Sequence, residues 1–196
     1  VKHLATIRDQ VKVKLVIVGS GPYTDKLQKL VSDLALDDIV IFTGLVDNSQ
    51  TAYYYKAADF FISASTSETQ GLTYIEALAS GTPVLATDNA YLQSLITEPV
   101  FGRLFASDDD IAATILAAIT ETPSFDQARY DQKLYEISAE NFALRVYEFY
   151  LDKIISNDQY LAQKGESIPR RTARIVRQAP AKTVKTVVRT PKKVAY

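Results

Sequence analysis

The stretch SASTSETQGLTYIEALASGTPV, residues 63–84, decides the fold of this 196-residue chain. It follows the apolar run at residues 60–62, which we interpret as a buried strand. It contains residues 72–79, whose pattern predicts a helix, and it ends in the apolar run at residues 83–86, which predicts the next strand. A strand, a helix and a second strand in this order predict a right-handed crossover between two parallel strands.

The same alternation extends towards the N-terminus. A strand over residues 11–18 stops at Gly19-Ser20-Gly21-Pro22, as a buried parallel strand does on meeting a tight turn. A helix follows, with an apolar stripe at three- and four-residue spacing, then a strand at residues 39–42 and a helix at residues 49–58. The fold class that we predict is α/β, a doubly wound parallel sheet with helices on both faces.

The two ends of the chain differ from this pattern. Residues 1–7 resemble the second half of a helix, and no Met is present even at position 1, so we expect the domain to be truncated at its N-terminus, with the preceding strand cut away. Residues 111–155 are wholly helical except near residues 122–124, and their aromatic excess predicts packing on a missing neighbouring domain. We therefore divide the chain into an α/β domain (1–124), C-terminal helices (125–163) and a basic tail (164–196).

The composition excludes several classes of protein. Without Cys, the chain has no disulfide framework, thiolate metal site or Cys nucleophile. Because His3 is the sole histidine, a metal site would need carboxylates alone, and we expect none. The chain has no apolar run long enough to span a bilayer and shows no export signal, so we expect a cytoplasmic protein.

The loop at residues 63–71 carries the candidate site. It leaves the carboxyl end of a strand, where open α/β sheets bind ligands. Gly71 allows close backbone approach, and the first helical amides, from Leu72 onwards, have no intrahelical acceptors, so they can bind a phosphate. Glu68 before these amides and Glu76 after them would accept hydrogen bonds from hydroxyls on either side of a diphosphate. A nucleotide sugar has that chemistry.

The spacing of the two glutamates does not decide the matter alone. Glu76 could equally be a solvated helix residue and Glu68 a loop charge near a helix start, with residues 81–83 forming an ordinary turn. Two glutamates eight positions apart also occur by chance.

Residues 67–72 and 76–84 resemble the E-x7-E signature of glycosyltransferase family 4. The resemblance extends in family order to LVIVGSGP (15–22), FTGLV (42–46) and AADFFI (57–62), and covers residues 11–124. Residues 63–81 and LYEISAENF (134–142) look most like the diacylglycerol glucosyltransferases of Gram-positive bacteria. The resemblance implies a retaining enzyme of the GT-B architecture, of which this chain would be the Rossmann-like C-terminal, donor-binding domain.

The resemblance also implies roles for particular residues. Glu68 would orient the donor hexose through its hydroxyls, as the catalytic residue rather than as a covalent nucleophile, and Glu76 would bind the ribose hydroxyls. The remaining donor-binding residues would border the sugar, diphosphate or nucleotide: Thr69, Gln70, Gly71, Leu72, Gly19, Gly44, Leu45 and Val46. The donor would be UDP-glucose, with no obligatory metal or other cofactor.

The chain departs from the family pattern at one residue, and part of the family's site would lie outside the chain. Gln70 stands where the family usually has Phe, which leaves a role for the backbone amide intact. The Arg and Lys that neutralise the donor diphosphate in the family would precede Val1, and the acceptor would bind to a separate N-terminal domain. We therefore expect the isolated chain to be inactive.

The charge of the chain is divided unevenly. Residues 1–163 carry 12 Lys and Arg against 22 Asp and Glu, whereas residues 164–196 carry 10 against 1. A basic tail interleaved with apolar residues favours an anionic membrane surface, at the inner face of the membrane, as its partner. Nucleic acid is disfavoured because Tyr196 is the sole aromatic residue there, and a solvated, disordered tail remains the alternative.

Three functional hypotheses follow. The leading one is transfer of a hexose to a membrane lipid such as diacylglycerol or monoglucosyldiacylglycerol. The second keeps the donor but uses a polysaccharide or a soluble sugar as acceptor. The third is a non-catalytic nucleotide-sugar-binding module tethered by its tail to a membrane or to nucleic acid.

Overall fold

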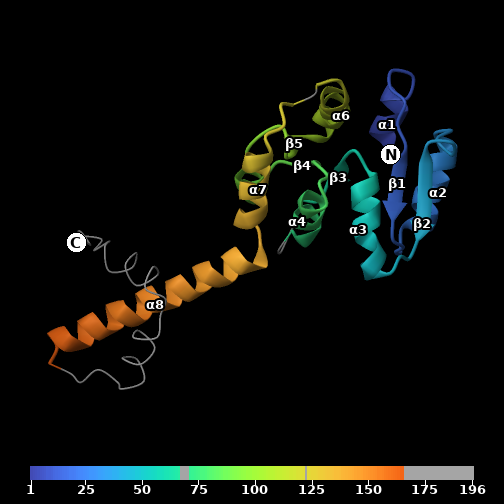
Figure 1. The fold of residues 1–196 in the computed structure, drawn as a ribbon. Helices are drawn as coiled ribbons and strands as arrows, with labels where there is room; N and C mark the ends of the chain where they lie inside the picture. The colour runs from blue at the N-terminus through green and yellow to red at the C-terminus, as the bar shows by residue number, and fades with distance from the viewer. Residues whose placement is uncertain (67–70, 122, 166–196) are drawn as a thin grey trace. The chain divides into compact units, whose positions relative to one another are not determined.

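The computed structural model describes residues 1–66, 71–121 and 123–165. Val1–Gln127 form one compact unit, and a second unit begins at Ala128. Three predicted site residues, Glu68, Thr69 and Gln70, lie outside the described residues, as does the tail from residue 166 onwards. Figure 1 shows the order of the elements along the chain.

The strands that the structure describes in the first unit pair in parallel, which confirms the predicted α/β fold with a parallel sheet. The strands are β1 (Leu15–Val18), β2 (Val40–Gly44), β3 (Phe61–Ser63), β4 (Val84–Thr87) and β5 (Gly102–Phe105). Among the described residues they form two sheets, β1-β2 and β3-β4-β5.

One face of these strands is covered by three helices: α1 (Lys2–Ile7), α2 (Thr24–Asp33) and α6 (Ile111–Thr120). Their buried side chains form a single apolar cluster with residues from strands of both sheets, including Val40, Leu85 and Phe105. The two sheets therefore share one core on this face.

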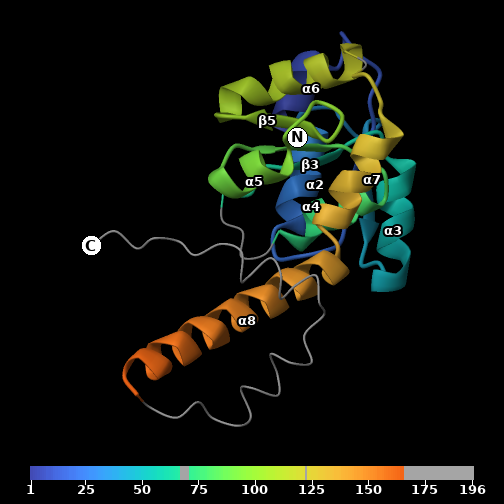
Figure 2. The ribbon, with the colours of Figure 1, turned by 60° about the vertical axis from the view of Figure 1, so that its left-hand side comes forward.

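The opposite face carries α3 (Asn48–Ala57), α4 (Leu72–Ala79) and α5 (Ala90–Leu95). Successive side chains of a strand point to opposite faces, so Val84 and Ala86, which are fully buried, lie opposite Leu85. Helix α4 contacts both β4 and α3. Figures 1 and 2 show α4 and α6 on opposite sides of the β3-β4-β5 sheet, as a doubly wound fold requires.

The predicted parallel sheet is divided into two sheets, with β1 and β3 at the facing edges. No ladder joins these two strands within the described part of the chain, and both border a cavity of about 2030 Å³. On β1, Val16 and Val18 are 43% and 41% exposed although a central strand is normally covered on both faces. The edges of β1 and β3 that face this cavity therefore lack a neighbouring strand among the described residues.

The second unit contains all of α7 (Gln127–Glu136) except its first residue, and all of α8 (Ala139–Gln163). The predicted helical region therefore breaks at residues 137–138 as well as at residues 121 and 123–126. On α8, Phe142, Phe149 and Tyr150 are more than half exposed. In the described residues, no helix is both long enough and apolar enough to cross a bilayer.

Candidate functional site

Helix α4 begins at a glycine whose backbone is left-handed. Gly71 precedes the helix with φ 60° and ψ 33°. A Cβ on this residue would lie 2.7 Å from Cε1 of Tyr91 and 3.0 Å from Cδ2 of Tyr74, so both the conformation and the space favour glycine. The chain thus enters α4 through a turn that a larger residue would strain.

The first amides of α4 are open to solvent. The N–H of Tyr74 donates to the carbonyl of Gly71 at 3.1 Å, which leaves Leu72 and Thr73 ahead of the first helical bond. No described residue accepts a hydrogen bond from these two amides, and both residues are exposed. Such N–H groups at the positive end of a helix dipole can bind an anionic oxygen.

A buried tyrosine fixes the start of α4 to the end of β3. The side chain of Tyr74 is fully buried, and its hydroxyl donates to Oγ of Ser63 at 3.1 Å. The Tyr74 ring also packs edge-on against Phe61, with 5.8 Å between centroids. The two ends of the β3–α4 loop are therefore held together beneath the open amides.

Glu76 lies one turn further along α4, on its exposed side. Its Oε2 accepts a hydrogen bond from the hydroxyl of Tyr55 on α3, at 3.3 Å. Burial raises the pKa of Tyr55 to about 12, and the neighbouring Glu76 carboxylate contributes to this rise. Both side chains border the large cavity. The carboxylate is thus held by one donor and accessible to others.

The other group of predicted donor-binding residues lies at the carboxyl ends of β1 and β2. The N–H of Gly19 donates to the carbonyl of Gly44 at 2.9 Å, so the structure brings these two predicted residues together. Leu45 is 84% exposed, and Val46 is partly buried. A turn with open backbone of this kind can border a flat ligand such as a nucleobase.

Sequence reasoning did not find Tyr55 or Thr82. The hydroxyl of Thr82 donates to the backbone carbonyl of Tyr55 at 2.6 Å, and the Thr82 side chain is almost fully buried. Tyr55 stands last in a run of three tyrosines, and nothing in the sequence distinguishes it from Tyr53 and Tyr54. Thr82 carried no signal either.

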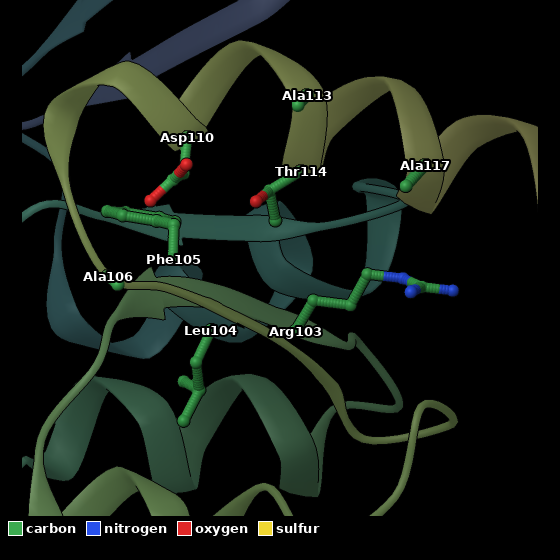
Figure 3. Close-up of a pocket in the computed structure, with 8 residues that line it drawn as sticks. All are labelled: Arg103, Leu104, Phe105, Ala106, Asp110, Ala113, Thr114 and Ala117. Carbon is green, nitrogen blue, oxygen red and sulfur yellow. The ribbon is translucent and has the colours of Figure 1, made fainter.

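A second cavity, of about 440 Å³, lies between β5 and α6, as Figure 3 shows. Its charged residues already have partners. Arg103 forms an ion pair with Glu121 at 2.5 Å, and Asp110 accepts from the hydroxyl of Ser107 at 2.8 Å as a helix cap. These interactions stabilise the fold, and we place no site here.

The described side chains include no group of three or more His, Cys, Asp or Glu residues arranged to hold a metal ion. The site contains the N–H groups of Leu72 and Thr73, the carboxylate of Glu76, and the turns at Gly19 and Gly44. It can bind a ligand that combines phosphate oxygens with hydroxyl groups.

Residues 1–135 match the family described as glycosyl transferases group 1, and the chain belongs to this family. The match includes α4 and its flanking strands. The parallel α/β fold agrees with it.

Two curated relatives have the same name, alpha-monoglucosyldiacylglycerol synthase. The protein of Streptococcus pneumoniae is 51% identical over 179 residues, which are 91% of this chain and 41% of the relative. That of Acholeplasma laidlawii is 31% identical over 156 residues, which are 77% of this chain and 38% of the relative. The chain thus spans about two-fifths of the length of each.

Solved structures of glycosyltransferases share the fold. A mutant of S. aureus TarM, bound to fondaparinux, α-GlcNAc-glycerol and UDP, matches with a TM-score of 0.61 at 25% identity, over 73% of this chain and 29% of TarM. Sucrose-phosphate synthase of Thermosynechococcus elongatus matches with the same TM-score at 26% identity, over 76% of this chain and 41% of the synthase.

Proposed function

We propose that this chain is the donor-binding part of a retaining glycosyltransferase that transfers glucose from UDP-glucose to diacylglycerol or monoglucosyldiacylglycerol. The observation that carries the proposal is the 51% identity, over 91% of the chain, to a protein named alpha-monoglucosyldiacylglycerol synthase. That relative is aligned with nearly all of this chain, and the family match over residues 1–135 includes α4. TarM, with a similar fold, was solved with bound UDP, which supports a uridine diphosphate donor.

The geometry of α4 suits the diphosphate and ribose of such a donor. The amides of Leu72 and Thr73 would bind oxygens of the diphosphate, since they are exposed at the positive end of the helix. Glu76 would accept hydrogen bonds from the ribose hydroxyls. A preorganised set of N–H groups stabilises the charge that develops on a leaving diphosphate.

The remaining residues would complete the donor site. Glu68, with Thr69 and Gln70, would orient the hexose, and Gly19 with Gly44, Leu45 and Val46 would border the nucleotide. Glu68 acts here by holding hydroxyls in a reactive orientation, a role that requires no covalent intermediate. The domain boundaries at residues 124 and 163 would separate this site from the helices and the basic tail.

The proposal also includes the acceptor site and the location of the enzyme in the cell. An N-terminal domain of the same protein would supply the acceptor site. Residues 165–196 would hold the enzyme at the anionic inner face of the membrane, where its lipid acceptor lies.

Transfer assays with the full-length protein test the proposal. Radiolabelled sugar should move from UDP-glucose to diacylglycerol-type acceptors, and not from a panel of other nucleotide sugars or to soluble sugars. Replacing Glu68 with Ala should lower kcat/KM by about 100-fold, because orientation of the reacting sugar is lost. Efficient transfer to polysaccharide, or full activity without Glu68, would contradict the proposal.

A further inference from the structure

The hydroxyl of Tyr55 links α3 to Glu76, at a point where the two helices lie side by side (Figure 1). It donates to Oε2 of Glu76 at 3.3 Å. Among the described residues, Oε1 of Glu76 makes no hydrogen bond, so one carboxylate oxygen is held and the other is open. A hydrogen bond to a charged acceptor is stronger than one between neutral groups.

Tyr55 is held through both its ring and its backbone. It packs edge-on against Phe61 on β3, with 5.4 Å between centroids. The Phe61 ring in turn packs against Tyr74 of α4. The backbone carbonyl of Tyr55 accepts from the buried hydroxyl of Thr82, just beyond α4. Tyr55 therefore has little freedom to move its hydroxyl away from Glu76.

The hydroxyl group of Tyr55 also stays protonated. Burial and the nearby Glu76 carboxylate raise its pKa to about 12, so the hydroxyl remains a donor throughout the pH range in which the protein would work. It can donate to only one acceptor at a time. Glu76, whose side chain is exposed, would otherwise sample several rotamers and lose that freedom on binding a ligand.

We propose that Tyr55 is a positioning residue, which orients the Glu76 carboxylate so that its open oxygen accepts from the ribose hydroxyls of the donor. This inference rests on the proposed function. The advantage is preorganisation: the Glu76 side chain is ordered before the ligand binds, so binding costs less conformational entropy.

The chain offers a matched control for the test. Replacing Tyr55 with Phe keeps the ring against Phe61 and removes only the hydroxyl. Tyr53 lies on the same helix and is 73% exposed, so Tyr53→Phe makes the same chemical change away from Glu76. Glu76→Gln removes the charge of the acceptor, and the double variant Tyr55→Phe with Glu76→Gln completes a thermodynamic cycle.

The experiment is calorimetric titration of the full-length protein and these variants with UDP, and then with the 2′,3′-dideoxy analogue of UDP. Tyr55→Phe should raise the Kd for UDP by about fivefold, in line with the net contribution of one ordinary hydrogen bond, while Tyr53→Phe leaves it unchanged. The double variant should bind UDP no more weakly than Glu76→Gln. The dideoxy analogue should bind the wild type and Tyr55→Phe equally.

Three results would overturn the inference while leaving the proposed function intact: a Kd for UDP in Tyr55→Phe that matches Tyr53→Phe, an additive loss in the double variant, or an equal loss with the dideoxy analogue. A purely structural role for Tyr55 would give the last two. If Glu76→Gln does not weaken UDP binding, or the wild type does not bind UDP, the role proposed for Glu76 fails, and the inference fails with it.

Discussion

Replacing Gly71 with Ala should destabilise the protein through two separate effects. An alanine in the left-handed region costs about 1–2 kcal/mol more than a glycine. The added methyl group would also lie 2.7 Å from the Tyr91 ring and 3.0 Å from the fully buried Tyr74 ring. Overpacking of this kind costs about 1–3 kcal/mol. Together the two effects predict a loss of about 2–5 kcal/mol.

A substitution at Gly81, just beyond the other end of α4, separates the conformational cost from the steric cost. It has φ +87°, and a Cβ there would meet no atom within 4 Å. Gly81→Ala should therefore show the conformational cost alone, about 1–2 kcal/mol. Adding Tyr91→Ala to Gly71→Ala should recover part of the loss, relative to Tyr91→Ala alone, because the closest contact is removed.

Thermal unfolding of the four variants, followed by circular dichroism, measures these differences. UDP titration of the same samples shows whether the strained turn also weakens binding at the amides of Leu72 and Thr73. Equal unfolding midpoints for Gly71→Ala and Gly81→Ala would refute the steric part of the reasoning. A wild-type midpoint for both would refute the conformational part.

Three further predictions concern other contacts. Thr82→Val should lower the free energy of unfolding by about 1–2 kcal/mol, measured by urea denaturation, because the carbonyl of Tyr55 loses its buried donor; an unchanged value would contradict this. Tyr74→Phe should lower the free energy of unfolding by about 1 kcal/mol in the same assay, because the hydrogen bond to Ser63 is lost. A decrease no greater than that caused by Tyr53→Phe, at an exposed residue, would contradict this prediction. Deleting residues 165–196 should abolish sedimentation of the full-length protein with anionic vesicles but not alter its behaviour with neutral ones, and unchanged sedimentation would reject membrane attachment through the tail.

The repeating pattern of strands and helices was predictable because it depends on local apolar periodicity. The bounds predicted for α4 are those observed, since Gly71 and Gly81 mark both of its ends. The strand expected over residues 11–18 starts only at Leu15, because Leu15 pairs with Val40 and the residues before Val40 form a turn. Pairing partners of this kind cannot be read from one strand alone.

Two short elements and one contact were not predicted. Helix α5 has six residues, and β5 begins with a glycine and contains Arg103, so neither has a clear apolar period. The contact of Tyr55 with Glu76 joins residues 21 positions apart through the packing of two helices. The sequence could place each residue on a helix, but not the two helices beside each other.

The separation of β1 from β3 has a consequence for the dynamics of the chain. β4 is paired on both sides, to β3 and β5, and three of its four residues are buried, whereas β1 and β3 each pair on one side only among the described residues. Amide hydrogens of β4 should therefore exchange with solvent most slowly, and those on the open edges of β1 and β3 far sooner. Local opening would then begin along the line between the two sheets, beside the cavity that Glu76 and Tyr55 border, and β4 would open only when the whole unit unfolds.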